Sequence, residues 1–313
     1  MLKIHEELCL GENEFSTHRF CAPIFIAGEF ELLLGDPLAR NQQPDTAKLR
    51  NGTLTFVSVN GGVYGITCRH VIEELERRQN DQKLEGKNKY GFETPEQVLA
   101  KIYIPQGNQH IHVNSKFHII PGDDFTGEQV DIAIAKINPS ILKAIGRFAI
   151  PASKVGRPTS TDIPGLCGIA TGCPEANRET SPQNELLNNF HISTLYAVAE
   201  FSCLDKKRVN LCGELSETPK GDNLSGMSGG PIFWSHETDW GLAGIIFNGR
   251  DLVGSEKSRS QSMFSKPAIW IDGETVEVST LEYWVSLIPP DEKFLYDGSK
   301  MLYMPEAFRR RAV

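Results

Sequence analysis

The sequence lacks two features that would each point to a particular class of protein. It has no uninterrupted apolar run of about 18 residues, which argues against a membrane-spanning helix. It has no dense block of lysine and arginine, and its formal charge is −8 at pH 7. Nucleic-acid-binding proteins usually carry a basic stripe. We therefore expect neither a membrane nor a nucleic acid among the partners of this protein.

The chain also lacks a secretory signal and a recognisable zinc-binding pattern. Glu6 and Glu7 interrupt the N-terminal stretch before an apolar region can form. The seven cysteines are scattered and odd in number, and the spacing of Cys167 and Cys173 matches no zinc site. We interpret the cysteines as reduced, mostly packed thiols, as is usual in the cytosol. The expected location is therefore cytoplasmic.

Short strand-like runs rich in Val, Ile, Phe and Thr dominate the chain, and helical patterns are sparse. Clusters of Gly, Pro, Asn and Asp separate the runs, a spacing typical of an all-β sandwich or barrel. A short helix is expected after His70, and the polar stretch 77–96 is expected to be a surface loop. The strand-like runs include 53–59, 63–68, 98–104, 111–120, 131–137, 190–202, 231–234, 241–247 and 262–271.

The segment 226–231, with the sequence Gly-Met-Ser-Gly-Gly-Pro, has the composition of a nucleophile loop. The glycines on either side of Ser228 allow the backbone to bend tightly, so that N–H groups can point at one spot. Such N–H groups stabilise an oxyanion by about 3–4 kcal/mol per donor. A tight turn with no chemical role is the alternative interpretation of the same letters.

The nucleophile elbow of the α/β-hydrolases shares the Gly-x-Ser-x-Gly pattern but does not fit here. That elbow needs a helix directly after the serine and a histidine far downstream. The residues after Ser228 instead form a strand-like run at 231–234, and the only later histidine is His236. We therefore reject the elbow.

A serine nucleophile needs a base, and the base needs a carboxylate that fixes its tautomer. Of the eight histidines, only His70 sits at the end of a strand-like run with a short helix after it. Asp131 opens an apolar strand-like run, where an acid is costly unless it has a partner. We expect His70 as base and Asp131 as its carboxylate. Asp123 and Asp124 lie in a polar turn and read as surface residues.

At this point the chain resembles the trypsin-like serine peptidases of the chymotrypsin fold. The landmarks are the segments 51–57, 67–71, 131–133 and 226–231, in the family's order of His, Asp and Ser. The resemblance implies His70, Asp131 and Ser228 as catalytic triad and the backbone N–H groups of Gly226 and Ser228 as oxyanion hole. It implies no metal and no organic cofactor.

The resemblance implies an all-β fold of two six-stranded antiparallel β-barrels with short helices. The first barrel would span 49–140 and carry His70 and Asp131, and the second would span 141–290 and carry Ser228. Residues 1–48 would be an N-terminal extension, and 291–313 a C-terminal tail.

Two departures from the family bear on where and how the enzyme acts. Val71 and Leu224 stand where secreted members have disulfide cysteines, which fits an intracellular enzyme. The resemblance is to an intracellular, bacterial-type member of the family. Met227 stands where digestive members have the acid that pairs with a freed N-terminus, so activation by N-terminal cleavage is not expected. The enzyme would be a regulated protease acting on a protein or peptide substrate, with a regulatory protein as a further partner.

The resemblance also implies a specificity pocket. Asp222 lies six residues before Ser228, where Lys/Arg-cutting members carry an acid, and the opposite wall would be Phe247, Asn248 and Gly249. Cleavage after Lys or Arg is the expectation, and a small or apolar residue is the alternative if Asp222 is a solvated turn residue. The alternative to an enzyme is a catalytically silent, protease-like scaffold that binds protein.

Overall fold

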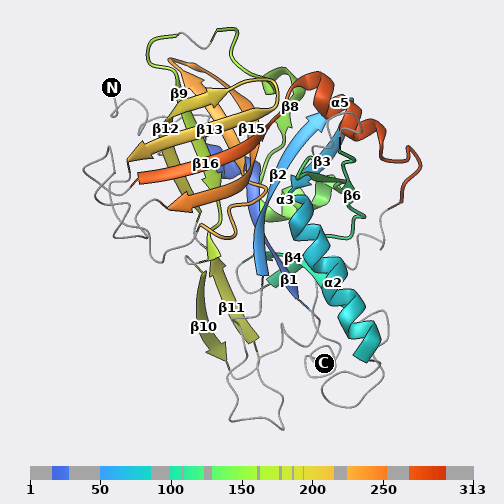
Figure 1. Cartoon of the computed structure of the whole chain (residues 1–313). Helices are drawn as coiled ribbons and strands as arrows, with labels where there is room; N and C mark the ends of the chain where they lie inside the picture. The colour runs from blue at the N-terminus through green and yellow to red at the C-terminus, as the bar shows by residue number, and fades with distance from the viewer. Residues whose placement is uncertain are drawn as a thin grey trace.

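The computed structural model describes most of the chain, and β-structure dominates it (Figure 1). Figure 1 shows a barrel built from the later strands lying beside a sheet built from the earlier ones. No helix among the described residues is long and apolar enough to cross a membrane. The described ranges are 16–27, 50–85, 99–106, 109–122, 129–160, 163–175, 178–184, 187–192, 194–214, 224–251 and 268–293.

The first unit is an eight-stranded sheet with the order β5-β4-β1-β2-β3-β7-β6, in which β8 pairs in parallel with β2. Strand β1 comes from the stretch expected as an N-terminal extension. It is buried along its whole length and pairs with β2 on one side and β4 on the other. The strands are β1 (Cys21–Ala27), β2 (Arg50–Val59), β3 (Gly62–Thr67), β4 (Lys101–Gln106), β5 (Gln109–His112), β6 (His118–Ile119), β7 (Ala133–Lys136) and β8 (Ile150–Pro151).

The prediction of two closed barrels is wrong for this first unit, because its sheet stays open. The two edges are β5 and β6, and residues 113–117 join them as irregular chain rather than as a ladder of hydrogen bonds. Strand β6 has only two residues and β5 only four. Edges this short offer too few backbone donors and acceptors to close a sheet.

The second unit is a closed six-stranded antiparallel barrel, which confirms the predicted barrel for this part of the chain. Its strand order is β12-β13-β16-β15-β14-β9, and β10 and β11 form a separate two-stranded hairpin. The barrel strands are β9 (Cys167–Gly172), β12 (Leu195–Leu204), β13 (Arg208–Glu214), β14 (Pro231–His236), β15 (Asp239–Asp251) and β16 (Ala268–Thr275), and the hairpin strands are β10 (Arg178–Asn184) and β11 (Leu187–Ile192).

The sheet and the barrel share one hydrophobic core at their junction. Val57 and Ile66 of the sheet belong to the same buried cluster as Ile169 and Phe233 of the barrel. Two further clusters fill the inner face of the sheet and the interior of the barrel. Burial of apolar surface on both sides of the junction fixes the two units against each other.

Helix α2 (Arg69–Glu85) begins directly after β3 and is longer than the sequence predicted, because residues 77–85 are helical rather than a loop. Ion pairs one turn apart support it, between Arg69 and Glu73 at 2.6 Å and between Arg78 and Glu74 at 2.9 Å. Arg78 also donates to the carbonyl of Ile26 in β1 at 3.2 Å. The other helices are η1 (Thr17–Phe20), α3 (Pro139–Ile145), η4 (Ala152–Lys154) and α5 (Val278–Ser286).

We predict that His112 makes the fold sensitive to mild acid. Burial, with a smaller contribution from Lys101, lowers the pKa of His112 from 6.5 to about 4. The folded state therefore keeps His112 neutral, while the unfolded chain takes up a proton as the pH falls below about 6.5. Stability should fall by about 2 kcal/mol between pH 7 and pH 5 through this group alone.

Urea unfolding of the wild type and His112→Gln at both pH values checks this expectation. Other titrating groups are common to both proteins and cancel in the comparison. Between pH 7 and pH 5, the free energy of unfolding of the wild type should fall by about 2 kcal/mol more than that of the variant. An equal loss in both proteins would show that His112 is not the acid-sensitive group.

Candidate active site

The loop that carries Ser228 belongs to the barrel but is held by strand β2 of the sheet. The N–H of Thr53 donates to the carbonyl of Ser228 at 2.8 Å, and the Thr53 hydroxyl donates to the carbonyl of Gly226 at 2.9 Å. The Thr55 hydroxyl donates to the carbonyl of Gly229 at 2.7 Å. Three carbonyls of the loop are thereby tied to one rigid strand, so the position of Ser228 is fixed relative to the sheet.

The same loop leaves two N–H groups without a protein acceptor among the described residues. Within it, the N–H groups of Met227, Gly229 and Gly230 donate to backbone carbonyls at 2.7–3.1 Å. Those of Gly226 and Ser228 do not, and these are the two that the sequence predicted as an oxyanion hole. Gly226 has a φ of +98°, a left-handed conformation that favours glycine.

His70 lies in the first turn of α2 and is held by Asp131. The Nδ1 atom of His70 lies 2.7 Å from one carboxylate oxygen of Asp131, and the backbone N–H of His70 donates to the other at 3.1 Å. Strand pairing brings the two residues together, since β3 ends just before His70 and its Thr67 pairs with Ala133 of β7. The double contact fixes both the position of the ring and the tautomer with Nε2 available as a base.

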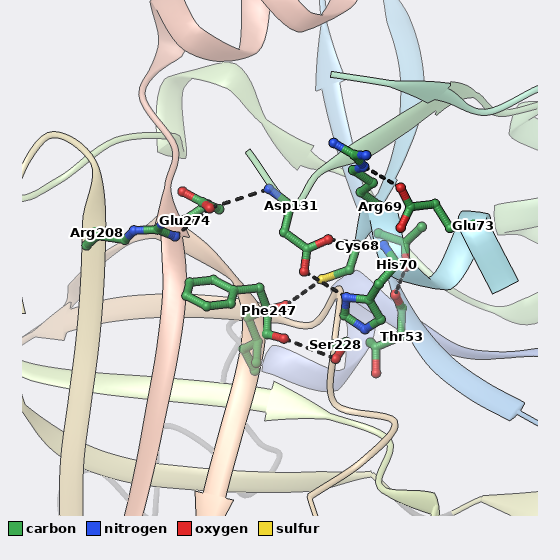
Figure 2. Close-up of polar contacts among 12 residues, drawn as sticks. Thr53, Cys68, Arg69, His70, Glu73, Asp131, Arg208, Ser228, Phe247 and Glu274 are labelled. Carbon is green, nitrogen blue, oxygen red and sulfur yellow. Dashed lines mark hydrogen bonds and ion pairs between the residues drawn. The ribbon is translucent and has the colours of Figure 1, made fainter. Parts of the chain in front are cut away.

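Figure 2 shows the His70 ring between the carboxylate of Asp131 and the side chain of Ser228. The Ser228 hydroxyl donates to the carbonyl of Phe247 at 3.4 Å, not to His70. Hydrogen bonds between nucleophile and base are often long or misaligned before substrate binds. Rotation of the hydroxyl from Phe247 toward His70 is the rearrangement that a nucleophilic role requires.

Two charged residues of the barrel that the sequence did not single out lie behind Asp131 (Figure 2). The backbone N–H of Asp131 donates to Glu274 of β16 at 3.5 Å, and Arg208 of β13 donates to the same carboxylate oxygen at 2.5 Å. Burial raises the pKa of Glu274, and Arg208 partly offsets that rise. No local signal in the sequence pointed to either residue, because a charged side chain on the outward face of a barrel strand is what an alternating pattern normally gives.

Cys68 brings a thiol next to the His70–Asp131 pair, a juxtaposition that the linear spacing of cysteines and histidines did not reveal. One ligand atom from each of these three residues lies within 4.8 Å of the other two. The Cys68 thiol donates to the carbonyl of Ile246 at 3.0 Å, and burial raises its pKa well above the usual value. The nearest partner of His70 in this group is the carboxylate of Asp131, at 2.7 Å from Nδ1.

The predicted pocket wall lies on β15, beside the serine. Phe247 accepts the hydrogen bond from Ser228 at a β-bulge, and its ring lies under Arg208, with 4.7 Å between the guanidinium carbon and the ring centroid. Asn248 donates to Asp272 at 3.3 Å. A side chain on Gly249 would meet Leu224 at 3.1 Å. Asp222, the predicted pocket acid, lies outside the described residues.

No protein-family model and no curated protein matches the chain. Among solved structures it is similar to a thermostable serine protease, AL20, from an extremophilic microorganism, with 11% identity, and to the protease Anisep from Arthrobacter nicotinovorans, with 10% identity. Both have a TM-score of 0.39 and cover 86% of this chain and 96% of their own. The serine protease domain of the Sesbania mosaic virus polyprotein has 11% identity and a TM-score of 0.35, and covers 86% of this chain and 99% of its own. Sequence identities and TM-scores this low carry no argument about the function of the chain.

We predict that Gly226→Ala destabilises the fold far more than an ordinary glycine substitution. A Cβ atom here would lie 2.3 Å from Nδ2 of Asn51 and 2.6 Å from the carbonyl of Cys173. Left-handed strain of about 1–2 kcal/mol would add to overpacking of about 1–3 kcal/mol. The matched control is Gly61→Ala, where φ is +75° and no heavy atom lies within 4 Å of the added Cβ atom. Denaturant unfolding should separate the two variants, and equal losses would show that the loop yields easily.

Proposed function

We propose that the protein is a serine endopeptidase that hydrolyses peptide bonds of protein substrates. The observation that supports this most is the His70–Asp131 pair, with its 2.7 Å contact, next to a glycine-flanked serine. The N–H groups of Gly226 and Ser228, which have no protein acceptor among the described residues, would provide the electrostatic part of such a site. Nucleophile, base and oxyanion donors would all come from the chain itself.

In the proposed reaction the hydroxyl oxygen of Ser228 attacks the carbonyl carbon of the scissile bond, and Nε2 of His70 takes the hydroxyl proton. Asp131 stabilises the imidazolium that results. The N–H groups of Gly226 and Ser228 bind the oxyanion. His70 then gives the proton to the leaving amine, which leaves an acyl-enzyme. A water molecule, deprotonated by His70, hydrolyses this ester and restores Ser228.

We predict that a fluorophosphonate probe labels the wild type and not Ser228→Ala. His70→Ala and Asp131→Asn should remain folded and lose about 10³–10⁴-fold or more of any peptidase rate, because triad members act as a unit.

The matched control is Ser225→Ala in the same loop. The Ser225 hydroxyl faces Glu175 at 3.5 Å rather than His70, so this variant should label like the wild type. Mass spectrometry of the labelled peptide identifies the modified serine. Labelling that survives in Ser228→Ala would overturn the assignment of the nucleophile.

The second candidate function is a silent, protease-like scaffold that binds protein. The observation that favours it is the Ser228 hydroxyl donating to Phe247 instead of His70. If this orientation persists in solution, the wild type will not react with the probe. Absence of labelling in a folded protein that retains the His70–Asp131 pair would therefore favour the scaffold.

The finer part of the proposal is a regulated, intracellular, trypsin-like enzyme that cuts after Lys or Arg, with a regulatory protein as partner. Met227 supports independence from N-terminal processing: it is fully buried beside Ser228 and offers no carboxylate to a new ammonium group. The substrate would be a protein or peptide, and no metal or organic cofactor would be needed.

We predict that wild type cleaves fastest after Arg or Lys and that Asp222→Ser removes this preference. A charge-assisted hydrogen bond to the substrate cation is worth about 1.5–3 kcal/mol, or roughly 10–100-fold in rate. A positional peptide library checks this preference, and the control is Asp239→Ser, which changes an exposed acid of β15. Equal cleavage after Ala or Leu by wild type would remove Asp222 from the pocket.

A further inference from the structure

Glu274 is a buried carboxylate at the junction between the barrel and the sheet. Only 7% of the residue is exposed. Neighbouring residues Ile271 and Gly273 of β16 line the barrel interior, while Glu274 points outward toward Asp131. Burying a carboxylate without compensation is costly, so the contacts made by this side chain need an explanation.

Arg208 compensates the charge of Glu274 and also reaches the serine side of the site. Its guanidinium donates to Glu274 at 2.5 Å and covers the Phe247 ring with 4.7 Å between guanidinium carbon and ring centroid. Phe247 in turn accepts the hydrogen bond from Ser228. One arginine therefore contacts both the residue behind Asp131 and the residue beside Ser228 (Figure 2).

The contact between Glu274 and Asp131 acts on the backbone of Asp131, not on its carboxylate. Both carboxylate oxygens of Asp131 are already engaged by the side chain and the backbone N–H of His70. Any shift of the Asp131 backbone is therefore transmitted to the imidazole. Misplacement of a catalytic group by about 1 Å can cost 10²-fold in rate.

We propose that Glu274, held in place by Arg208, is a positioning residue for Asp131 and through it for His70. This inference rests on the proposed peptidase function. Glu274 touches neither substrate nor reacting atoms. Its carboxylate anchors the N–H of Asp131, and its negative charge adds to that of Asp131 in stabilising the imidazolium.

The charge part of this role predicts a direction for the pH profile. The charged and titratable groups around Glu274 are Arg208 from β13, Asp131 from the segment before β7, and Cys68 from the segment before α2. Glu274→Gln removes one negative charge near the imidazolium and leaves Arg208 uncompensated. Both changes disfavour protonated His70, so kcat/KM should reach its plateau at a lower pH than in wild type.

The experiment compares Glu274→Gln, Glu274→Ala and Arg208→Lys with the control Glu277→Gln. Glu277 forms the same kind of ion pair, with Arg157 at 2.5 Å. Glu274→Ala should lower kcat about 10–100-fold with KM nearly unchanged. Glu274→Gln should be milder and shift the pH profile, Arg208→Lys should retain most activity, and Glu277→Gln should behave like wild type.

A second measurement works without activity. In a Ser228→Ala background, the proton on Nδ1 of His70 gives a far-downfield NMR signal because of its short hydrogen bond to Asp131. The signal should persist in Glu277→Gln and broaden or disappear in Glu274→Ala. Far-ultraviolet circular dichroism shows whether each variant folds, and if Glu274→Ala does not fold, the isosteric Glu274→Gln takes its place in both measurements.

The kinetic measurement and the NMR measurement together separate the inference from the function on which it rests. If wild type is inactive but the signal depends on Glu274, the peptidase proposal fails and the positioning role stands. If wild type is active, and folded Glu274 variants keep both the signal and the pH profile of wild type, the positioning role is overturned. A uniform loss of rate in Glu274→Gln with an unshifted profile would also overturn the charge part of the role.

Discussion

The hydrogen bonds from Thr53 and Thr55 to the serine loop are the contacts on which the rest of the site depends. Ser228 belongs to the barrel, whereas His70 and Asp131 belong to the sheet, so no strand carries all three. Strand β2 joins them: Thr53 binds the loop through its N–H and hydroxyl, and its carbonyl accepts the hydroxyl of Thr67, three residues before His70. These hydrogen bonds to the carbonyls of the serine loop hold the loop in one position relative to β2. The shared hydrophobic core holds the sheet and the barrel together.

Electrostatics at the junction follow from this packing. At the junction Glu274 is buried and Asp131 is partly buried, and the two carboxylates repel each other. Among the described residues, Arg208 donates a charged hydrogen bond to Glu274. The N–H groups of Asp131 and His70 donate to Glu274 and Asp131, respectively. Such arrangements seldom add net stability over an apolar junction, so a role in positioning explains them better than a role in folding.

The residues that the sequence singled out each stand in a motif that can be recognised locally. Glycines around Ser228, an acid opening an apolar strand and a histidine between strand and helix each have a local physical reason, and the structure brings His70 and Asp131 into contact. Their catalytic roles stay predictions. Glu274 and Arg208 have no local signature, because their partners come from strands more than 60 positions apart in the sequence. The sequence also could not predict that the first sheet stays open. Closure depends on the lengths of the edge strands β5 and β6, and the alternating pattern does not define where a strand ends.

Helix α2 shows how a polar sequence was mistaken for a loop, and why the difference matters for the site. Its charged residues were interpreted as solvated loop residues, yet they pair one turn apart, and Arg78 anchors the helix to β1. The N–H of His70 in the first turn lacks an acceptor within the helix and is satisfied by Asp131. Asp131 therefore caps the helix with one oxygen and orients the imidazole with the other. The start of α2 and the orientation of the His70 ring therefore depend on the same carboxylate.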